Sequence, residues 1–215
     1  ETWDHDIPVR LRRVMENAGG AFVKIGQMLS LRSDLLPQEY CVEFAKLQDA
    51  VKPIPFPDVK RVVERELKKP LRDLFAEFDE KPLASASVGQ VHRAKLKSGQ
   101  TVAVKVQRPE VTRQFAADID LLHFLAEEAE KHLPELRPYK PRKMVEEFEH
   151  YTYRELDYRI EAKNLETFSE KFKLSAKIKV PKVYGDYTTS RVLTMEFVDG
   201  KKISEVSLTK EQGKK

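Results

Sequence analysis

The chain has 215 residues, of which 40% are hydrophobic and 34% are charged, and its formal net charge is +4. This composition predicts an ordered globular protein with a buried core and excludes a disordered chain. The small positive excess is scattered among 35 acidic residues, so it does not call for a nucleic-acid partner, and we expect none.

Cysteine usage and hydropathy bear on the compartment. The single cysteine, Cys41, excludes an internal disulfide and favours a reducing environment. No apolar run approaches about 20 residues, so we expect no membrane-spanning segment. The polar start of the chain is unlike a signal peptide. We therefore expect a cytoplasmic protein, with peripheral membrane contact left open, that forms part of a longer chain.

Helical periodicity dominates the first 70 residues. Residues 8–32 predict two helices that meet at Gly19-Gly20. A third and a fourth helix are predicted at 38–49 and 57–68. The scarcity of glycine, at eight residues, fits this helical character.

From residue 75 onward the pattern mixes strands and helices. Short β-type runs predict five strands, at 75–83, 88–96, 101–107, 180–186 and 191–197. Between the third and fourth of these, helical periodicity predicts helices at 111–132 and 143–172. A five-stranded antiparallel sheet with a long helix after its third strand is the architecture of the upper lobe of a protein kinase.

We therefore predict an α+β fold with a protein-kinase-like N-lobe, composed of this sheet and an αC-type helix. The predicted divisions are a helical extension at 1–74, the N-lobe at 75–198 and a truncated end at 199–215. The order of elements is suggestive by itself, because α+β orders recur in many folds.

Lys105 ends the apolar strand that begins at Thr101. In kinase-like folds the lysine of the third strand points into the cleft and binds the α- and β-phosphates of ATP. The competing interpretation is a strand end whose lysine extends to water.

Three carboxylates on the helix predicted at 143–172 are candidate partners for this lysine. Asp157 and Glu161 are four residues apart and share a face, whereas Glu155 points elsewhere and would pair with Arg159 on a solvated face. Apolar neighbours bury part of this helix, and a buried carboxylate needs a cation. Lys105 could supply that cation.

A loop of small residues precedes the second predicted strand. Small side chains allow backbone N–H groups to approach phosphate oxygens, so this loop could cover a nucleotide. An ordinary tight turn would have the same composition. The loop residues are Ala84, Ser85, Ala86, Ser87, Val88 and Gly89.

Lys24 and Gln27 share a face of the second predicted helix, with Gly26 between them. Glycine costs a helix about 1 kcal/mol relative to alanine, so it suits a place where another backbone or a ligand comes close. Simple helix–helix packing would explain the same glycine.

The last predicted strand leads into a short acidic turn, as a kinase hinge does. Backbone groups of Glu196 and Val198 would meet the adenine edge, Met195 would lie at the back of the pocket, and Ala103 would lie on the strand that carries Lys105. A buried strand followed by a turn is the alternative.

In order and in sum these motifs resemble the UbiB/ABC1 family of atypical protein-kinase-like proteins, also called ADCK proteins. The resemblance covers about residues 10–200. The matching residues are Lys24, Gly26 and Gln27 for the KxGQ signature, 84–89 for the alanine-rich loop, Lys105 for the strand lysine, Glu155 and Asp157 for the ExD motif, and Glu161 for the following helix glutamate.

The resemblance implies binding of ATP or ADP with Mg²⁺, and an ATPase or atypical kinase activity in the full-length protein. It implies a link to isoprenoid quinone (ubiquinone-type) or other prenyl-lipid metabolism, with protein partners in lipid biosynthesis. It also implies roles for the matched residues. Lys105 would bind the phosphates and Glu161 would orient it; Lys24 and Gln27 would reach into the cleft, where Glu155 and Asp157 would hold the extension.

The chain departs from the complete kinase pattern. It has neither a His-x-Asp segment followed by asparagine nor an Asp-Phe-Gly-type metal ligand, and Asp199-Gly200 directly follows the hinge. We therefore expect the C-lobe, the catalytic residues and the metal ligands to be absent from this chain, which alone would be inactive. The alternative is a non-catalytic module that binds a prenyl lipid, an anionic membrane surface or a protein, with nucleotide as a conformational ligand. The amphipathic helices predicted at 8–32 and 111–132 favour it.

Overall fold

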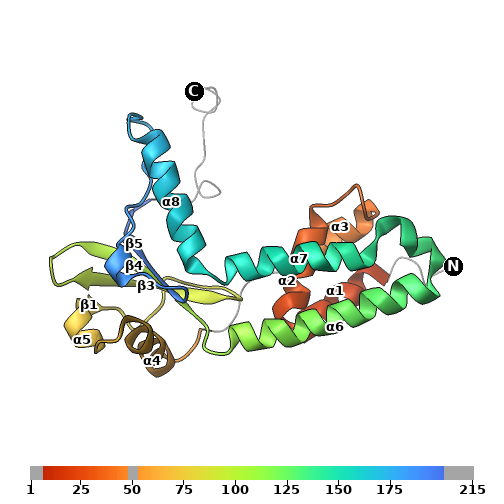
Figure 1. Ribbon diagram of the computed structural model, residues 1–215, viewed down its shortest axis with the longest axis horizontal. Coiled ribbons are helices and arrows are strands. Elements are labelled where there is room, and N and C mark those ends of the chain that lie inside the picture. Colours follow the sequence, from red (N-terminus) through yellow and green to blue (C-terminus); the bar gives the residue numbers. More distant parts are fainter. Residues whose placement is uncertain (1–6, 48–52, 201–215) are drawn as a thin grey trace.

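The protein was analysed as a computed structural model, which describes residues 7–47 and 53–200. One antiparallel sheet occupies one end of the molecule and a block of helices the other (Figure 1). The strands run in the order β1-β3-β4-β5, with β2 paired to β3. Their bounds are β1 (Phe75–Phe78), β2 (Ala84–Ser85), β3 (Gly89–Leu96), β4 (Thr101–Gln107) and β5 (Val192–Glu196).

β4 is the central strand because its sequence suits a position buried on both faces. Val102, Val104 and Val106 are completely buried, and β-branched side chains favour extended backbone. A tight turn joins β3 to β4, and Gly99 in that turn has φ of +94°, which glycine adopts without strain. The strands predicted at 88–96 and 101–107 therefore form an antiparallel hairpin.

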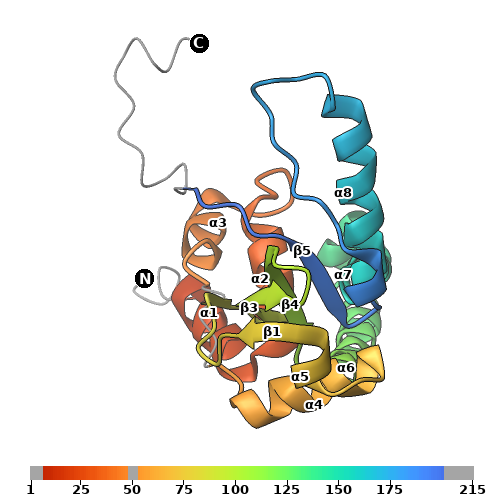
Figure 2. The same ribbon diagram turned by 90° about the vertical axis from the view of Figure 1, so that its left-hand side faces the viewer.

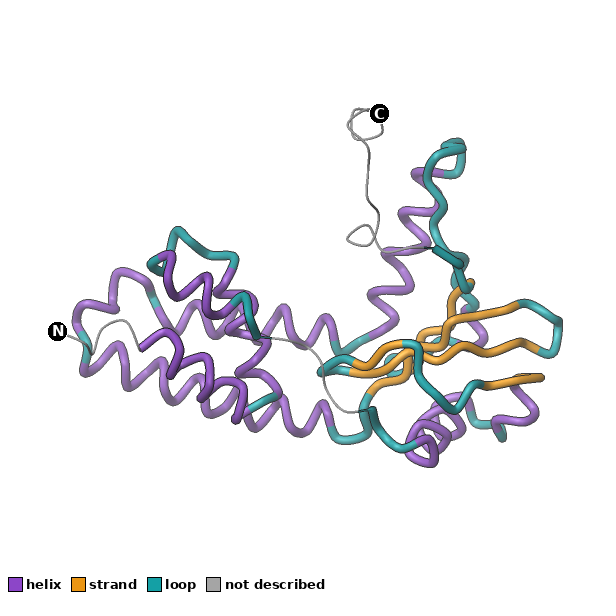
Figure 3. Tube along the Cα trace, turned by 180° about the vertical axis from the view of Figure 1, so that it is seen from behind, coloured by secondary structure: helices purple, strands orange, loops and turns teal. Residues whose placement is uncertain are grey.

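Two helices cover one face of the sheet, α4 (Phe56–Leu67) and α5 (Leu71–Leu74) (Figures 1 and 3). Val59 and Val63 are fully buried on α4 and belong to the same apolar core as the valines of β4. Both helices precede residue 75, yet they pack with the strands. The predicted domain boundaries at 74/75 and 198/199 remain predictions.

The helical block combines α1 (Ile7–Ala18), α2 (Gly20–Ser30) and α3 (Gln38–Phe44) with α6 (Val111–His132) and α7 (Pro141–Glu155). Its core includes Phe115 and Phe148, which are buried on α6 and α7. Asp118 of α6 accepts a hydrogen bond of 3.0 Å from the backbone N–H of Ala21. This long-range cap fixes the first turn of α2, and therefore ties the amino-terminal helices to α6.

The prediction of one continuous helix at 143–172 is wrong. It divides into α7 and α8 (Tyr158–Phe172), and Asp157 caps the start of α8 through a 3.0 Å hydrogen bond from the N–H of Arg159. The break has a tertiary cause. The side chain of Gln107 donates to the carbonyl of Leu156, and the N–H of Tyr158 donates to the carbonyl of Ser190. These bonds engage backbone groups of residues 156 and 158 that a continuous helix would use in its own hydrogen bonds. The helix is interrupted here, and α8 lies beside the sheet (Figure 2).

The strand predicted at 180–186 is also wrong. That segment makes one isolated bridge, between Val183 and Met195, and residues Gly185–Tyr187 form a 3₁₀ turn. The fifth strand of the sheet is β2, which lies inside the loop predicted at 84–89. The predicted end of the third helix at 48–49 and the chain from 201 onward lie outside the described residues.

Candidate functional site

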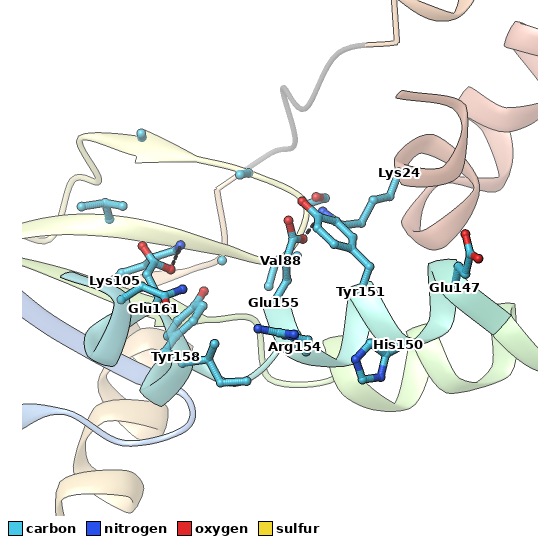
Figure 4. A pocket seen from close by; sticks show the side chains of 17 residues that line it. Lys24, Val88, Lys105, Glu147, His150, Tyr151, Arg154, Glu155, Tyr158 and Glu161 are labelled. Atoms are coloured by element: carbon cyan, nitrogen blue, oxygen red, sulfur yellow. Dashed lines mark hydrogen bonds and ion pairs between the residues drawn. The ribbon is translucent and has the colours of Figure 1, made fainter. Parts of the chain in front are cut away.

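Lys105 extends from the central strand toward α8. Its Nζ lies 2.7 Å from Oε2 of Glu161, and the two side chains are 29% and 41% exposed (Figure 4). Glu161 lies in the first turn of α8, where a carboxylate is favoured by the helix dipole. The start of α8 therefore places the Glu161 carboxylate where it fixes the position of Lys105. Both side chains remain open to solvent on one side.

Tyr158 lies beneath this pair. Its ring centre is 4.7 Å from Nζ of Lys105, and the residue is 1% exposed. An ammonium group at this distance from an aromatic ring is attracted by the ring's negative face. Lys105 is thus positioned by an anion and a ring that both belong to α8.

A tight turn of small residues forms the roof of the site. The N–H of Ala86 donates to the carbonyl of Gly89 at 2.8 Å. Arg108 holds this turn from below: its backbone N–H donates to Val88, and its guanidinium donates to the Ala86 carbonyl and the Ser85 hydroxyl. The ordered turn leaves the N–H groups of residues 87 and 88 without an acceptor among the described residues, which suits an anionic ligand.

An ion pair between Lys24 of α2 and Glu155 of α7 forms the side wall. Lys24 also lies 5.8 Å from the ring centre of Tyr151. A hydrogen bond to Glu155 raises the pKa of the Tyr151 phenol above its usual value. The pair is partly buried, with side chains 15% and 34% exposed, and it connects residues 131 positions apart in the sequence.

These elements enclose a cleft of about 560 Å³, here called the lysine cleft. The loop, β4, α2, α7 and α8 all contribute to its wall (Figure 4). Its lining residues are Lys24, Ala84, Ala86, Ser87, Val88, Gly89, Val91, Lys105, Glu147, His150, Tyr151, Arg154, Glu155, Tyr158, Ile160, Glu161 and Asn164.

A second cavity of about 570 Å³ lies on the far side of the Lys24–Glu155 pair. Lys24, Glu155, Tyr151 and Glu147 line both cavities, so the ion pair is part of the partition between them. The remaining lining of this second cavity is largely apolar: Gln27, Met28, Leu29, Leu31, Arg32, Leu35 and Met144.

Reversing the charges of Lys24 and Glu155 tests how strongly this ion pair holds the helical extension in place. Lys24→Glu would set two carboxylates together, and Glu155→Lys two cations. We expect each to lower the free energy of unfolding by about 1–2 kcal/mol, and the double reversal to recover most of that loss. Thermal melts provide the measurement.

The pair Lys173–Glu170 at the end of α8 supplies the control, because its side chains are 64% and 76% exposed. The same reversals there should change stability by a few tenths of a kcal/mol. Single reversals at Lys24 and Glu155 that are equally mild would contradict a holding role.

Other predicted site residues have contacts away from the lysine cleft. Asp157 caps α8 and pairs with Arg159, which lowers the pKa of the Asp157 carboxyl. The predicted pairing of Glu155 with Arg159 is therefore wrong, and among the described residues the ion pair of Asp157 is with Arg159 and not with the extension. Gln27 donates to the carbonyl of Leu47 within the helical block.

Gly26 lies where helices pack closely. A methyl group added there would lie 2.3 Å from Cδ1 of Leu47 and 2.8 Å from Sδ of Met15. The glycine is therefore accounted for by packing inside the extension, one of the two interpretations of the sequence.

The predicted adenine-side residues lie on β4, on β5 and in the segment that follows β5. Ala103 pairs with Met195 across the two strands, and Met195 packs against the cluster of Tyr158, Ala162 and Leu193. The N–H of Glu196 donates to the carbonyl of Lys182, its carboxylate pairs with Lys179, and Val198 is exposed. These residues, together with Ser85, fall outside the lining of the lysine cleft.

Three residues that contribute to the site were not singled out from the sequence: Tyr158, Arg108 and Tyr151. Tyr158 directly follows the ExD motif but has the pattern of a core aromatic. Arg108 follows the strand of Lys105 at a position typical of a solvated strand end. Only their folded positions show that each contacts a site residue.

Within residues 7–47 and 53–200, no three or more His, Cys, Asp or Glu side chains gather as metal ligands do. In the same ranges, every helix is too short or too polar to traverse a lipid bilayer.

The sheet with its αC-type helix, and the strand lysine paired with a glutamate of that helix, define a protein-kinase-like N-lobe. Residues 46–215 match the family described as ABC1 atypical kinase-like domain. This chain belongs to the ABC1 atypical kinase-like family.

Individual relatives agree with this assignment. The chain is 43% identical over 197 residues to the Arabidopsis thaliana protein ACTIVITY OF BC1 COMPLEX KINASE 8, chloroplastic. It is 41% identical over 191 residues to the uncharacterised protein sll0095 of Synechocystis sp.. The alignments cover 91% and 87% of this chain but 26% and 34% of those proteins, so the chain spans about a quarter to a third of their length.

A solved structure has the same fold. The complex of Rv3197 with erythromycin from Mycobacterium tuberculosis superimposes with a TM-score of 0.60 at 29% sequence identity. The likeness covers 89% of this chain and 48% of that one.

Proposed function

We propose that this chain is the nucleotide-binding part of an atypical kinase or ATPase. The observation that carries the proposal is the Lys105–Glu161 pair, 2.7 Å apart, on the floor of a cleft roofed by a turn of small residues. In kinase-like proteins this pairing marks the arrangement in which the lysine holds ATP phosphates.

The chemistry of the cleft fits the phosphates of ATP or ADP. Lys105 presents a fixed positive charge from below, and the N–H groups of residues 87 and 88 in the roof have no acceptor among the described residues. Small side chains let backbone approach phosphate oxygens closely. A volume of about 560 Å³ is also in the range of a ligand-sized pocket.

Mg²⁺ fits the described residues less well. Glu161 and Glu155 are each paired with a lysine, and residues 7–47 and 53–200 contain no group of three or more His, Cys, Asp or Glu side chains placed to hold a metal ion. Metal ligands would have to come from elsewhere in the full-length protein, and we assign no step to the metal here.

ATP hydrolysis suits this cleft better than transfer to a protein substrate. Lys24, Glu155 and Tyr151 close its side between α2 and α7, which restricts the approach of a second macromolecule. The name of the Arabidopsis relative, ACTIVITY OF BC1 COMPLEX KINASE 8, supports the kinase-type assignment. We extend the proposal to a role of the full-length protein in isoprenoid quinone or other prenyl-lipid metabolism.

The second cavity favours the alternative of a lipid- or partner-binding module. Its apolar lining includes Met28, Leu29 and Met144, and Leu31 beside it is 84% exposed. Cosedimentation with liposomes of anionic lipid, and with liposomes that contain a prenyl quinone, would measure this. Binding without any nucleotide turnover would support the module.

Titration of the full-length protein with MgATP and MgADP tests the main proposal, alongside Mg²⁺-dependent release of phosphate. We expect micromolar binding and slow hydrolysis, both reduced by a metal chelator. Absence of nucleotide binding would overturn the proposal, and binding without hydrolysis would favour the module.

A further inference from the structure

Tyr158 has a buried hydroxyl that no other part of the site explains. The residue is 1% exposed, and its hydroxyl makes no hydrogen bond to any described residue. A buried polar group without a partner is unfavourable, and in native proteins it calls for a specific explanation. The Tyr158 hydroxyl therefore calls for a hydrogen-bond partner beyond the described residues.

The position of the hydroxyl is fixed from three sides. The N–H of Tyr158 donates to the carbonyl of Ser190 at 3.0 Å, which holds the start of α8 against the sheet. Above the ring lies Lys105. At the tip, a methyl group built on Gly89 would lie 2.5 Å from the hydroxyl, so the glycine provides the space that the phenol occupies.

Tyr158 helps to line the lysine cleft, and its hydroxyl is directed toward the side chains of that cleft, with Gly89 packed against its tip (Figure 4). The nearest carboxylates are already engaged, Glu161 by Lys105 and Glu155 by Lys24. Burial, with a smaller contribution from these two carboxylates, raises the pKa of the Tyr158 phenol above its ordinary value. The group is therefore a proton donor throughout the neutral pH range.

We propose that Tyr158 is a ligand-binding residue whose hydroxyl donates a hydrogen bond to a phosphate oxygen of the nucleotide held by Lys105. The inference rests on the proposed function and adds a contact to it. Because Lys105 lies over the same ring, a phosphate that binds its ammonium group comes within reach of the hydroxyl at the ring's edge. The ligand supplies the acceptor that the protein does not.

The substitution Tyr158→Phe removes this one oxygen and keeps the ring. In the full-length protein we expect the dissociation constant for MgADP to rise about tenfold, as befits a lost hydrogen bond to a charged group. Affinity for adenosine, which lacks phosphate, should change less than twofold. The melting temperature without ligand should stay constant or rise, because an unpaired buried hydroxyl has been removed.

Tyr153→Phe is the matched control, since Tyr153 is exposed on α7 and lies outside the lysine cleft. It should change neither affinity nor melting temperature. Unchanged MgADP affinity in Tyr158→Phe would overturn the inference while the wild-type titration upholds the proposed function. A lowered melting temperature would show a structural role and overturn it too, as would an equal loss for adenosine. If the wild-type protein binds no nucleotide, both proposals fail.

Discussion

Replacing Lys105 with methionine is expected to weaken nucleotide binding at least about 100-fold in the full-length protein. The lysine is the cation on the floor of the lysine cleft, and the loss of two charge-assisted hydrogen bonds to phosphate accounts for about 3 kcal/mol. Methionine keeps an unbranched side chain of similar length, so packing on the ring of Tyr158 persists. ATP hydrolysis should be lost with binding.

The fold should survive this change. Glu161 is 41% exposed, so its carboxylate stays hydrated when its partner is removed, and the cost should be within about 1 kcal/mol. Lys95→Met, on the neighbouring strand β3, is the control: Lys95 is 45% exposed and pairs with Glu77. Calorimetric titration and thermal melts of both variants separate binding from stability. Nucleotide affinity within a few-fold of wild type in Lys105→Met would argue against the proposed site.

The elements that the sequence predicts well are those whose signals are local. The helix at 111–132 and the strand at 101–107 have the predicted bounds. In both elements, the periodic pattern of apolar side chains stops at segments that contain Gly or Pro. Local preference and tertiary packing therefore agree on where each element begins and ends.

The errors arise where tertiary contacts decide. Asp157 is a local cap at the break between α7 and α8, but this break also depends on hydrogen bonds from Gln107 and to Ser190, which lie 49 and 32 residues away in the sequence. In the same way, Ala84 and Ser85 have the composition of a loop, and their pairing with Val91 and Gln90 makes them a strand. Propensity cannot foresee a partner that only the fold supplies.

The candidate site follows the same division. Lys105 and Glu161 could be named from motif spacing, and the fold brings them together. Tyr158 could not, because a buried tyrosine in a helix indicates core packing until its unpaired hydroxyl is seen beside the cleft. The ion pair that closes the site, Lys24–Glu155, depends on the docking of α2 against α6 and α7.

A single methyl group at Gly89 is expected to disturb both the sheet and the roof of the cleft. The Cβ of Gly89→Ala would lie 2.5 Å from the carbonyl oxygen of Val106 and 2.5 Å from the hydroxyl of Tyr158. The first obstacle is backbone of the central strand, so it cannot rotate away as a side chain could. We expect a loss of about 2–3 kcal/mol in the free energy of unfolding, at the upper end of overpacking costs.

Gly185→Ala is the matched control, because a methyl group there meets no atom within 4 Å and neither glycine has positive φ. It should leave the melting temperature unchanged, whereas Gly89→Ala should lower it by roughly 4–10 °C. Adding Tyr158→Phe to Gly89→Ala should restore only part of the stability, because the clash with the Val106 carbonyl remains. Full recovery of the melting temperature in the double variant would mean that the Tyr158 hydroxyl alone, and not the Val106 carbonyl, excludes a methyl group at position 89. A melting temperature equal to wild type in Gly89→Ala itself would contradict the close approach of β3 and β4 at this point.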